Sequence, residues 1–141
     1  MKLFQILFVF AGLFYLIGVL FAISPIYANT KTATFSIPSG PYYYSMSFNL
    51  LPWGSISGSF SESAGHTVNI YILNDEQLTA YSSSGQSQSI FSTSGPSGSF
   101  SASVSAVGRY SIVAGHGLGY EQTSQQLQVN YTVYGEGLPL W

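Results

Sequence analysis

Two histidines and five carboxylates are the side chains of this sequence that could transfer a proton or bind a metal. They are His66, His116, Glu62, Asp75, Glu76, Glu121 and Glu136. His116 and Glu121 share one glycine-rich segment, which makes them the first candidates for a metal site or an acid–base pair. A catalytic zinc usually takes three protein ligands. His66 would supply the third only if two separate loops met, and the lack of cysteine excludes a thiolate site.

The serines, although numerous, do not form a nucleophile motif. The sequence has no Gly-x-Ser-x-Gly elbow, and its serines alternate with apolar residues as on the outer face of strands. Asp75 and Glu76 follow Asn74, a position where acidic residues stabilise the first turn of a helix. We therefore predict no catalytic residue, no metal site and no cofactor, and we expect that the protein is not an enzyme.

Candidate binding residues lie instead in two loops. The segment Ser82–Ser97 is rich in Ser, Gly and Gln, and the segment Gly115–Ser124 is rich in glycine. Loops of this length are usually functional or mobile. The binding residues that the two loops predict are Ile90, Phe91, His116, Tyr120 and Glu121.

The elements that must hold these loops are strands, because apolar residues recur with a period of two from Lys31 onward. The residues predicted to face inward are, strand by strand, Tyr42, Tyr44, Met46, Phe48 and Leu50; Ile56 and Phe60; Val68, Ile70 and Ile72; Phe100, Ala102 and Val104; Tyr110 and Ile112; and Leu127, Val129, Tyr131 and Val133. With Thr34–Ile37 as an edge strand, these runs predict an all-β fold, an antiparallel β-sandwich of about seven to eight strands. A helical turn is expected after Asn74, capped by that residue and by Gln77.

One short motif occurs twice, as SGSFSES at Ser57–Ser63 and as SGSFSAS at Ser97–Ser103. In both copies we expect the glycine to open a strand, the phenylalanine to face inward and the serines to face water. The residues that follow the two copies differ, and no helical turn follows the second copy. We interpret the pair as one strand-turn-strand pattern used twice, not as a duplicated domain.

The N-terminal residues form the most apolar stretch of the chain. Leu3–Ile23 contains Gln5 as its one strongly polar residue, and its length suits the hydrocarbon core of a bilayer, about 30 Å thick. Lys2 precedes it, which places the remainder of the chain outside the cytoplasm. Two interpretations stay open: an uncleaved transmembrane helix, and a signal peptide cleaved after Ala28. In both, residues 1–28 form the anchor or signal, and residues 29–141 form one exported domain.

The order of these features resembles a known family. An aromatic strand (YYYSMSFNL) is followed by GSISGSF, VNIYIL, NDEQLTAY, SGSFSASV, VGRYSIVA and LQVNYTVYG. Over roughly residues 35–135 the pattern is similar to the jelly-roll β-sandwich of Golgi-dynamics (GOLD) lumenal domains and to small exported archaeal surface proteins. The resemblance implies a non-enzymatic interaction module on the outer side of a membrane. GOLD cargo receptors carry a membrane helix after the domain, whereas this sequence ends at Trp141, so we expect any anchor at the N-terminus.

The surface chemistry excludes one class of partner and indicates one modification. Only 6% of the residues are charged, against about 25% in ordinary soluble proteins. The cations are Lys2, Lys31 and Arg109, too few for the basic surface that nucleic-acid binding requires. Asn130-Tyr131-Thr132 is an N-glycosylation sequon, and Asn130 is predicted to face outward, so we predict Asn130 as a glycosylation site.

Two classes of function are compatible with these features. The preferred one is a membrane-anchored or exported binding module outside the cytoplasm, whose partner is another surface protein or a glycan. The alternative is a structural subunit of a surface filament or envelope layer, in which Asn29–Ile37 adds as a strand to a neighbour's sheet. The alternative needs a free N-terminal segment and hence cleavage after Ala28, whereas a binding module can stay anchored.

Overall fold

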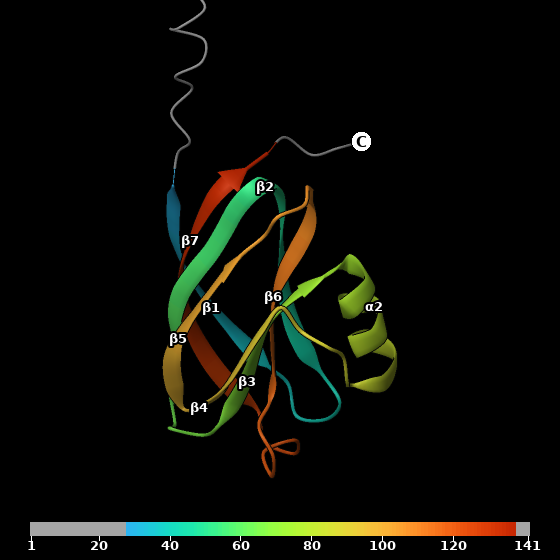
Figure 1. The fold of residues 1–141 in the computed structure, drawn as a ribbon. Helices are drawn as coiled ribbons and strands as arrows, with labels where there is room; N and C mark the ends of the chain where they lie inside the picture. The colour runs from blue at the N-terminus through green and yellow to red at the C-terminus, as the bar shows by residue number, and fades with distance from the viewer. Residues whose placement is uncertain (1–27, 138–141) are drawn as a thin grey trace, which may run out of the picture.

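The computed structural model describes residues 28–137, which form an antiparallel all-β fold with a short helix (Figure 1). The elements are β1 (Asn29–Ile37), β2 (Tyr43–Glu62), β3 (Val68–Asn74), α2 (Asp75–Ser84), β4 (Phe91–Gly95), β5 (Ser97–Ser103), β6 (Gly108–His116) and β7 (Gln125–Glu136). The predicted all-β antiparallel class is confirmed, and the seven strands belong to one curled sheet. The predicted hydrophobic helix at the N-terminus lies outside the described residues. Within residues 28–137 no helix is long and apolar enough to cross a membrane.

The long strand β2 organises the sheet. Its first half, Tyr43–Leu50, pairs with β6, and its second half, Ser55–Glu62, pairs with both β5 and β7. The strand order is β1-β7-β2-β6-β3-β4, with β5 paired to β2 beside this path. The sheet therefore curls, so that its two halves enclose a common core (Figure 1).

The sequence predicted two separate strands where the structure has the single strand β2. A register shift between Leu50 and Ser55 marks the bend, where Leu51–Gly54 on β2 lie opposite Gly135 on β7. This is a local bulge, which bends a strand without ending it. The predicted and observed totals are both seven, because the sequence analysis counted β2 twice and did not predict β4.

The predicted inward phase of the strands is confirmed for nearly every residue. The buried core contains Phe48, Leu50, Ile56, Phe60, Val68, Ile70, Ile72, Phe100, Ala102, Val104, Tyr110, Ile112, Leu127, Val129, Tyr131 and Val133, and Tyr44 and Met46 pack against it. Tyr42 is the exception: its side chain is 57% exposed, because it lies in the turn before β2 begins. The predicted edge strand extends over the whole of Asn29–Ile37 and pairs with β7.

The two copies of the repeated motif are partners in the sheet. Gly58 lies opposite Phe100, and Phe60 lies opposite Gly98. A Cβ added at Gly58 would come within 2.7 Å of the Phe100 ring, and one at Gly98 within 3.0 Å of the Phe60 ring. The expectation that the glycine opens a strand is therefore corrected for the first copy: Gly58 lies inside β2. Each glycine instead leaves space for the phenylalanine ring of the other strand.

The helix α2 is capped as predicted and is longer than predicted. The Asn74 side chain accepts a hydrogen bond from the Gln77 N–H (2.9 Å), and the Gln77 side chain accepts one from the Asn74 N–H (3.0 Å). The helix ends at Gly85, whose left-handed φ of 69° suits glycine. The predicted long loop Ser82–Ser97 is wrong, since it holds the last turn of α2, the strand β4 and the start of β5.

Candidate binding groove

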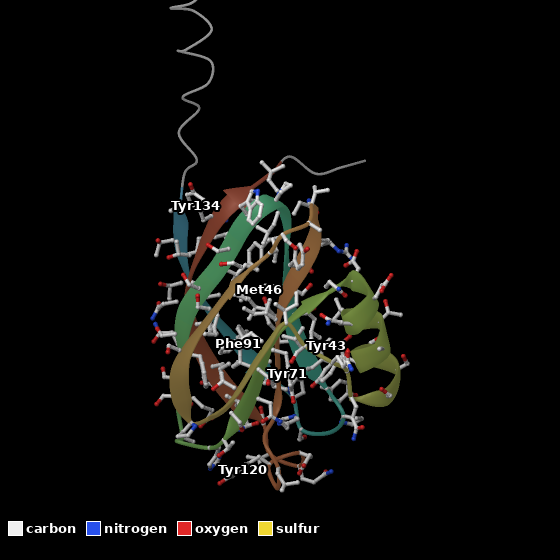
Figure 2. All side chains as sticks on the ribbon, in the orientation of Figure 1. Tyr43, Met46, Tyr71, Phe91, Tyr120 and Tyr134 are labelled. Carbon is white, nitrogen blue, oxygen red and sulfur yellow. The ribbon has the colours of Figure 1, made fainter. Side chains whose placement is uncertain are left out.

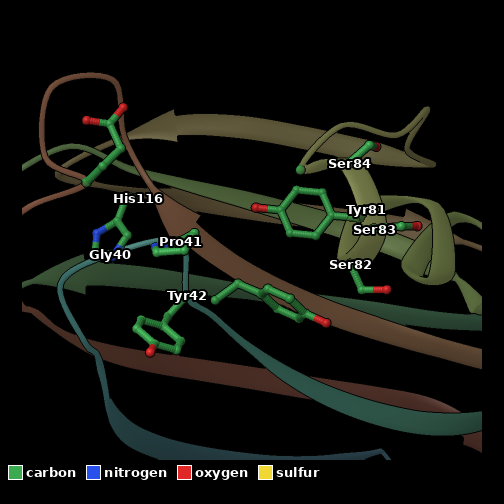
Figure 3. A pocket seen from close by; sticks show the side chains of 11 residues that line it. Gly40, Pro41, Tyr42, Tyr81, Ser82, Ser83, Ser84 and His116 are labelled. Carbon is green, nitrogen blue, oxygen red and sulfur yellow. The ribbon is translucent and has the colours of Figure 1, made fainter.

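A groove of about 370 Å³ lies where three segments that are distant in sequence meet (Figure 3). One wall is the turn Gly40–Tyr43, the second is the last turn of α2 and its cap, Tyr81–Gly85, and the third is made by His116 and Glu121. Pairing of Tyr43 with Gly115 brings the first and third walls together. The volume is within the range of about 300–1,000 Å³ that is typical of pockets for small ligands.

Tyr81 is the central side chain of the groove and is held by aromatic neighbours. Its ring centroid lies 5.3 Å from that of Tyr43, nearly edge-on at 83°, and 5.3 Å from that of Tyr71. A Cβ at Gly115 would clash with the Tyr81 hydroxyl, so the glycine leaves the space that this hydroxyl occupies. In Figure 3 the Tyr81 ring projects from α2 toward the turn that carries Pro41. Packing thus directs a tyrosine hydroxyl into the groove.

The surroundings of Tyr81 change its acidity. Burial, followed by the nearby Tyr71 and Tyr43 hydroxyls, raises the pKa of Tyr81 to about 12. Desolvation disfavours the phenolate, and the other two tyrosines add repulsion once they ionise. The Tyr81 hydroxyl therefore stays protonated, as a hydrogen-bond donor, well above neutral pH.

We expect an absorbance titration to reveal one tyrosine that ionises near pH 12, and this late step should be missing in Tyr81→Phe. The folded pKa lies above the value of about 10 for an unfolded tyrosine, so the stability linked to this proton is complete below pH 10. It is lost as the pH rises from 10 toward 12. Tyr134→Phe, at a half-exposed tyrosine elsewhere, is the matched control and should retain the late step. A late step that persists in Tyr81→Phe would contradict the assignment.

His116 is a structural clamp at the wall of the groove. Its Nε2–H donates to the Pro38 carbonyl (2.8 Å), and its Nδ1 lies 2.8 Å from Gln125 Oε1. The buried Gln125 in turn donates through Nε2 to the Thr67 carbonyl (2.9 Å). Both imidazole nitrogens are therefore engaged, which fixes the turn before β2 against β7. The ring borders the groove, but it offers no free nitrogen to a metal.

The loop after His116 is tied to the same turn. The Gly40 N–H donates to the Glu121 carbonyl (2.6 Å), and the Glu121 side chain accepts a hydrogen bond from the Gly119 N–H (3.2 Å). Tyr120 stacks on His66, with ring centroids 4.7 Å apart and planes 20° apart. Two loops do meet here, yet no group of three His, Cys, Asp or Glu side chains in residues 28–137 could hold a metal ion.

The predicted site residues thus separate into two groups. His116 and Glu121 line the groove, and Tyr120 lies on the same loop but packs against His66. Ile90 and Phe91 lie at the start of β4; the Ile90 N–H donates to the Ile72 carbonyl, and Phe91 packs against the core. Neither of these two residues lines the groove.

Three tyrosines, Tyr42, Tyr43 and Tyr81, are among the groove residues that the sequence did not reveal. Tyr42 and Tyr44 were predicted to face inward, and Tyr43, which lies between them, was given no role. The structure makes Tyr42 and Tyr43 groove residues, 57% and 37% exposed. The run of three tyrosines after Gly40-Pro41 was the available signal, since one side of a strand cannot bury all of them.

Two of the remaining carboxylates, Glu62 and Asp75, are engaged by neighbouring groups. Glu62 is buried, and its Oε2 accepts hydrogen bonds from the N–H groups of Ala64 (2.9 Å) and His66 (2.7 Å), which orders the turn after β2. Asp75 lies in the first turn of α2, as predicted, and pairs with Arg109 at 2.8 Å on the surface. Such an exposed ion pair contributes at most about 1 kcal/mol.

Asn130 lies on the outward face of β7, as predicted. Its side chain is exposed and accepts a hydrogen bond from the Thr32 hydroxyl (2.7 Å) on β1. Glycosylation of Asn130 stays a prediction.

No protein-family profile matches this chain, and no curated protein matches it either. Solved structures do. A periplasmic inhibitor of g-type lysozyme from Aeromonas hydrophila aligns with a TM-score of 0.53 at 14% identity, covering 78% of this chain and 87% of its own. The Yersinia pseudotuberculosis-derived mitogen aligns with a TM-score of 0.55 at 9% identity, and the alignment covers 79% of this chain and 92% of the mitogen. A carbohydrate-binding module aligns over 78% of this chain and 93% of its own at 10% identity, but its TM-score of 0.38 is too low to indicate a shared fold.

At these identities the similarity concerns the fold alone. The chain shares a β-sandwich architecture with a periplasmic inhibitor domain and with a bacterial mitogen. None of these structures is a GOLD domain or an archaeal surface protein, so that resemblance keeps the status of a prediction. The similar structures support a β-sandwich fold for this chain, and the groove is the feature that bears on its function.

Proposed function

We propose that residues 29–137 form a non-enzymatic binding module outside the cytoplasm, tethered to a membrane by Leu3–Ile23, and that its groove binds a short neutral glycan. The observation that carries this proposal is the composition of the groove, which is lined by tyrosines, serine hydroxyls and one carboxylate. Aromatic rings pack against the apolar faces of sugars, and hydroxyl and carboxylate oxygens accept hydrogen bonds from sugar hydroxyls. The GOLD-like pattern of the sequence and the sandwich fold support the same class of module.

The walls of the groove offer complementary hydrogen-bonding groups. The Tyr81 hydroxyl stays a donor, and Glu121 lies exposed at the rim. The Ser82 and Ser83 hydroxyls both donate to the Thr79 carbonyl (2.8 and 2.7 Å), so their oxygens remain free to accept from a ligand. The described residues that line the groove include one carboxylate and no Lys or Arg, so the groove suits a neutral ligand better than an anion.

The same lining supports binding without catalysis. Most glycosidases need two carboxyl groups on either side of the scissile bond, about 5–9.5 Å apart. Glu121 is the one carboxylate among the described residues that line the groove, and both nitrogens of His116 are engaged. A bound glycan would therefore meet no acid–base pair and would be released unchanged.

The alternative function, strand donation to a neighbour, is less well supported. β1 pairs with β7 of its own chain over its full length, from Asn29 opposite Val133 to Ile37 opposite Gln125. Donation would require β1 to leave this pairing and a neighbour's strand to replace it. The internal pairing therefore favours the binding module.

We expect calorimetry of the full chain with neutral oligosaccharides, selected on a glycan array, to show binding that Tyr42→Ala weakens at least about tenfold. An aromatic side chain that packs against a ligand can contribute about 2 kcal/mol or more to binding, and about 1.4 kcal/mol is a factor of ten in affinity. Tyr134→Ala is the matched control, since Tyr134 is a half-exposed tyrosine that does not line the groove. Equal affinity of both variants for the oligosaccharide would contradict the assignment of the groove. If no glycan on the array bound and the protein instead bound a surface protein, the partner would be that protein and not a glycan.

A further inference from the structure

Four large apolar side chains are exposed at the end of the fold away from the groove. They are Leu51 (49% exposed), Trp53 (79%), Val107 (52%) and Tyr134 (40%), and we call them the apolar tip. Strand pairing brings them together, because Leu50 lies opposite both Gly108 on β6 and Glu136 on β7. Figure 2 shows Tyr134 at this end and Tyr120 at the other.

The backbone of the tip holds Trp53 in an unusual conformation. Among residues 28–137, Trp53 is the one non-glycine residue with positive φ, at 67°. Its N–H donates to the Val104 carbonyl (2.8 Å), and the Val104 N–H donates to the Gly54 carbonyl (2.9 Å). These bonds fix a strained bulge whose largest side chain contributes nothing to the core. Strain of this kind, where the surrounding structure imposes it, is typical of functional positions.

The described chain begins at the same end of the fold. Asn29, the first residue of β1, lies opposite Val133, the neighbour of Tyr134, and Figure 1 shows β1 starting at the same end of the fold as the bend of β2, with β7 between the two strands. The segment Ser24–Ala28 is all that separates Asn29 from the apolar run that ends at Ile23. Fully extended, these residues reach at most about 18 Å. A bilayer that holds Leu3–Ile23 must therefore lie close to the apolar tip.

We propose that the apolar tip docks into the headgroup region of the membrane that anchors the chain. The inference rests on the tether of the proposed function and adds a second, non-covalent contact with lipid. Trp and Tyr are the side chains enriched at membrane–water interfaces, because their rings are apolar and their N–H or O–H groups are polar. Glu136 is exposed beside the tip, so zwitterionic lipid is the expected partner, rather than an anionic surface that would repel it.

Docking at the tip fixes the orientation of the domain. The groove end and the tip end are separated by the first half of β2, from Tyr43 to Leu50. At about 3.4 Å per residue this separation is about 24 Å. The groove would then face away from the membrane, where soluble or surface-bound glycans are accessible.

The test uses the intrinsic fluorescence of Trp53 in the full chain. The sequence has two tryptophans, so Trp141→Phe leaves Trp53 as the single probe. The protein is reconstituted into vesicles of phosphatidylcholine with and without bromine on the acyl chains. We expect blue-shifted emission from Trp53 that brominated lipid quenches strongly. The matched control carries Trp53→Phe, Trp141→Phe and Leu118→Trp; position 118 is 93% exposed on the loop at the groove end, and its emission should be unquenched.

Three results would overturn the inference. Trp53 that stays red-shifted and unquenched in protein that floats with the vesicles would mean that the tip faces water. Blue-shifted but unquenched emission would mean that protein, for example the C-terminal residues 138–141, covers the tip instead of lipid. If the protein did not float with the vesicles, both the membrane tether and the docking of the apolar tip would be wrong. Oligosaccharide binding is measured on the same samples, so a failure of the groove would be seen separately.

Discussion

Replacing Phe100 by alanine is expected to lower the free energy of unfolding by about 3–5 kcal/mol, as is usual for deletion of a buried phenylalanine. The Phe100 side chain is 2% exposed, and its ring occupies the space above Gly58 on the partner strand. Within residues 28–137, β5 pairs with β2 alone, so the surrounding residues can collapse only partly into the cavity. Denaturant unfolding, followed by circular dichroism, measures the loss.

The neighbouring residue supplies the control. Ser101 is exposed on the opposite face of β5, so Ser101→Ala should change the free energy of unfolding by less than about 0.5 kcal/mol. Comparable losses at positions 100 and 101 would mean that the inward phase of β5 is wrong. A loss at Phe100 alone would establish that the second copy of the repeated motif is a core strand.

Substituting Gly58 by alanine is expected to cost about 3 kcal/mol, in the upper part of the range for overpacked cores. An added Cβ would clash with the Asn130 carbonyl and would lie 2.9 Å from Tyr131 Cα and 2.7 Å from the Phe100 ring. Two of these three neighbours are backbone atoms of β7, which cannot move without breaking the strand pairing. Unfolding of Gly58→Ala in denaturant measures this cost.

Two other glycines make the prediction specific. At Gly98 the nearest atoms belong to the Phe60 ring, at 3.0 and 3.2 Å, so Gly98→Ala should cost less because a side chain can shift. At Gly108 the nearest atom is 3.6 Å away, an ordinary contact, so Gly108→Ala should stay within about 0.5 kcal/mol of the wild type. Equal losses at all three glycines would contradict the close approach of β2 and β7 at Gly58. In a double-mutant cycle, the variant with both Gly58→Ala and Phe100→Ala should lose less free energy of unfolding than the two single variants lose in total.

Much of the fold followed from the sequence, because strand phase is a local property. Side chains alternate between the two faces of a strand, so the polarity of each residue indicates which face meets water. The inward residues of β3, β5, β6 and β7 were predicted in this way and are buried. The capping box of α2 was predicted for the same reason, since Asn74 and Gln77 interact within one turn.

The missed elements lacked a local signal. β4 reads FSTSG, whose serines, threonine and glycine are typical of loops, and only its pairing with β3 makes it a strand. The bend of β2 contains Pro52 and Gly54, which are typical of a turn that ends a strand, yet hydrogen bonds to Val104 carry the chain through a bulge. In both places the pairing partner decides the structure, and it lies far away in the sequence.

Some groove residues could likewise be predicted from local sequence, and others depend on contacts between distant segments. His116 and Glu121 were identified from residue type and spacing, whereas the tyrosines that give the groove its aromatic lining were not. Tyr43 and Tyr81 lie on different elements, and they meet because β2 pairs with β6 and Gly115 leaves space for the Tyr81 hydroxyl. The sequence by itself determined which residues face the core, since each residue's own polarity sets that choice. Only the tertiary structure decided which outward residues share a surface, because that depends on strand partners and on close backbone approaches that no local pattern encodes.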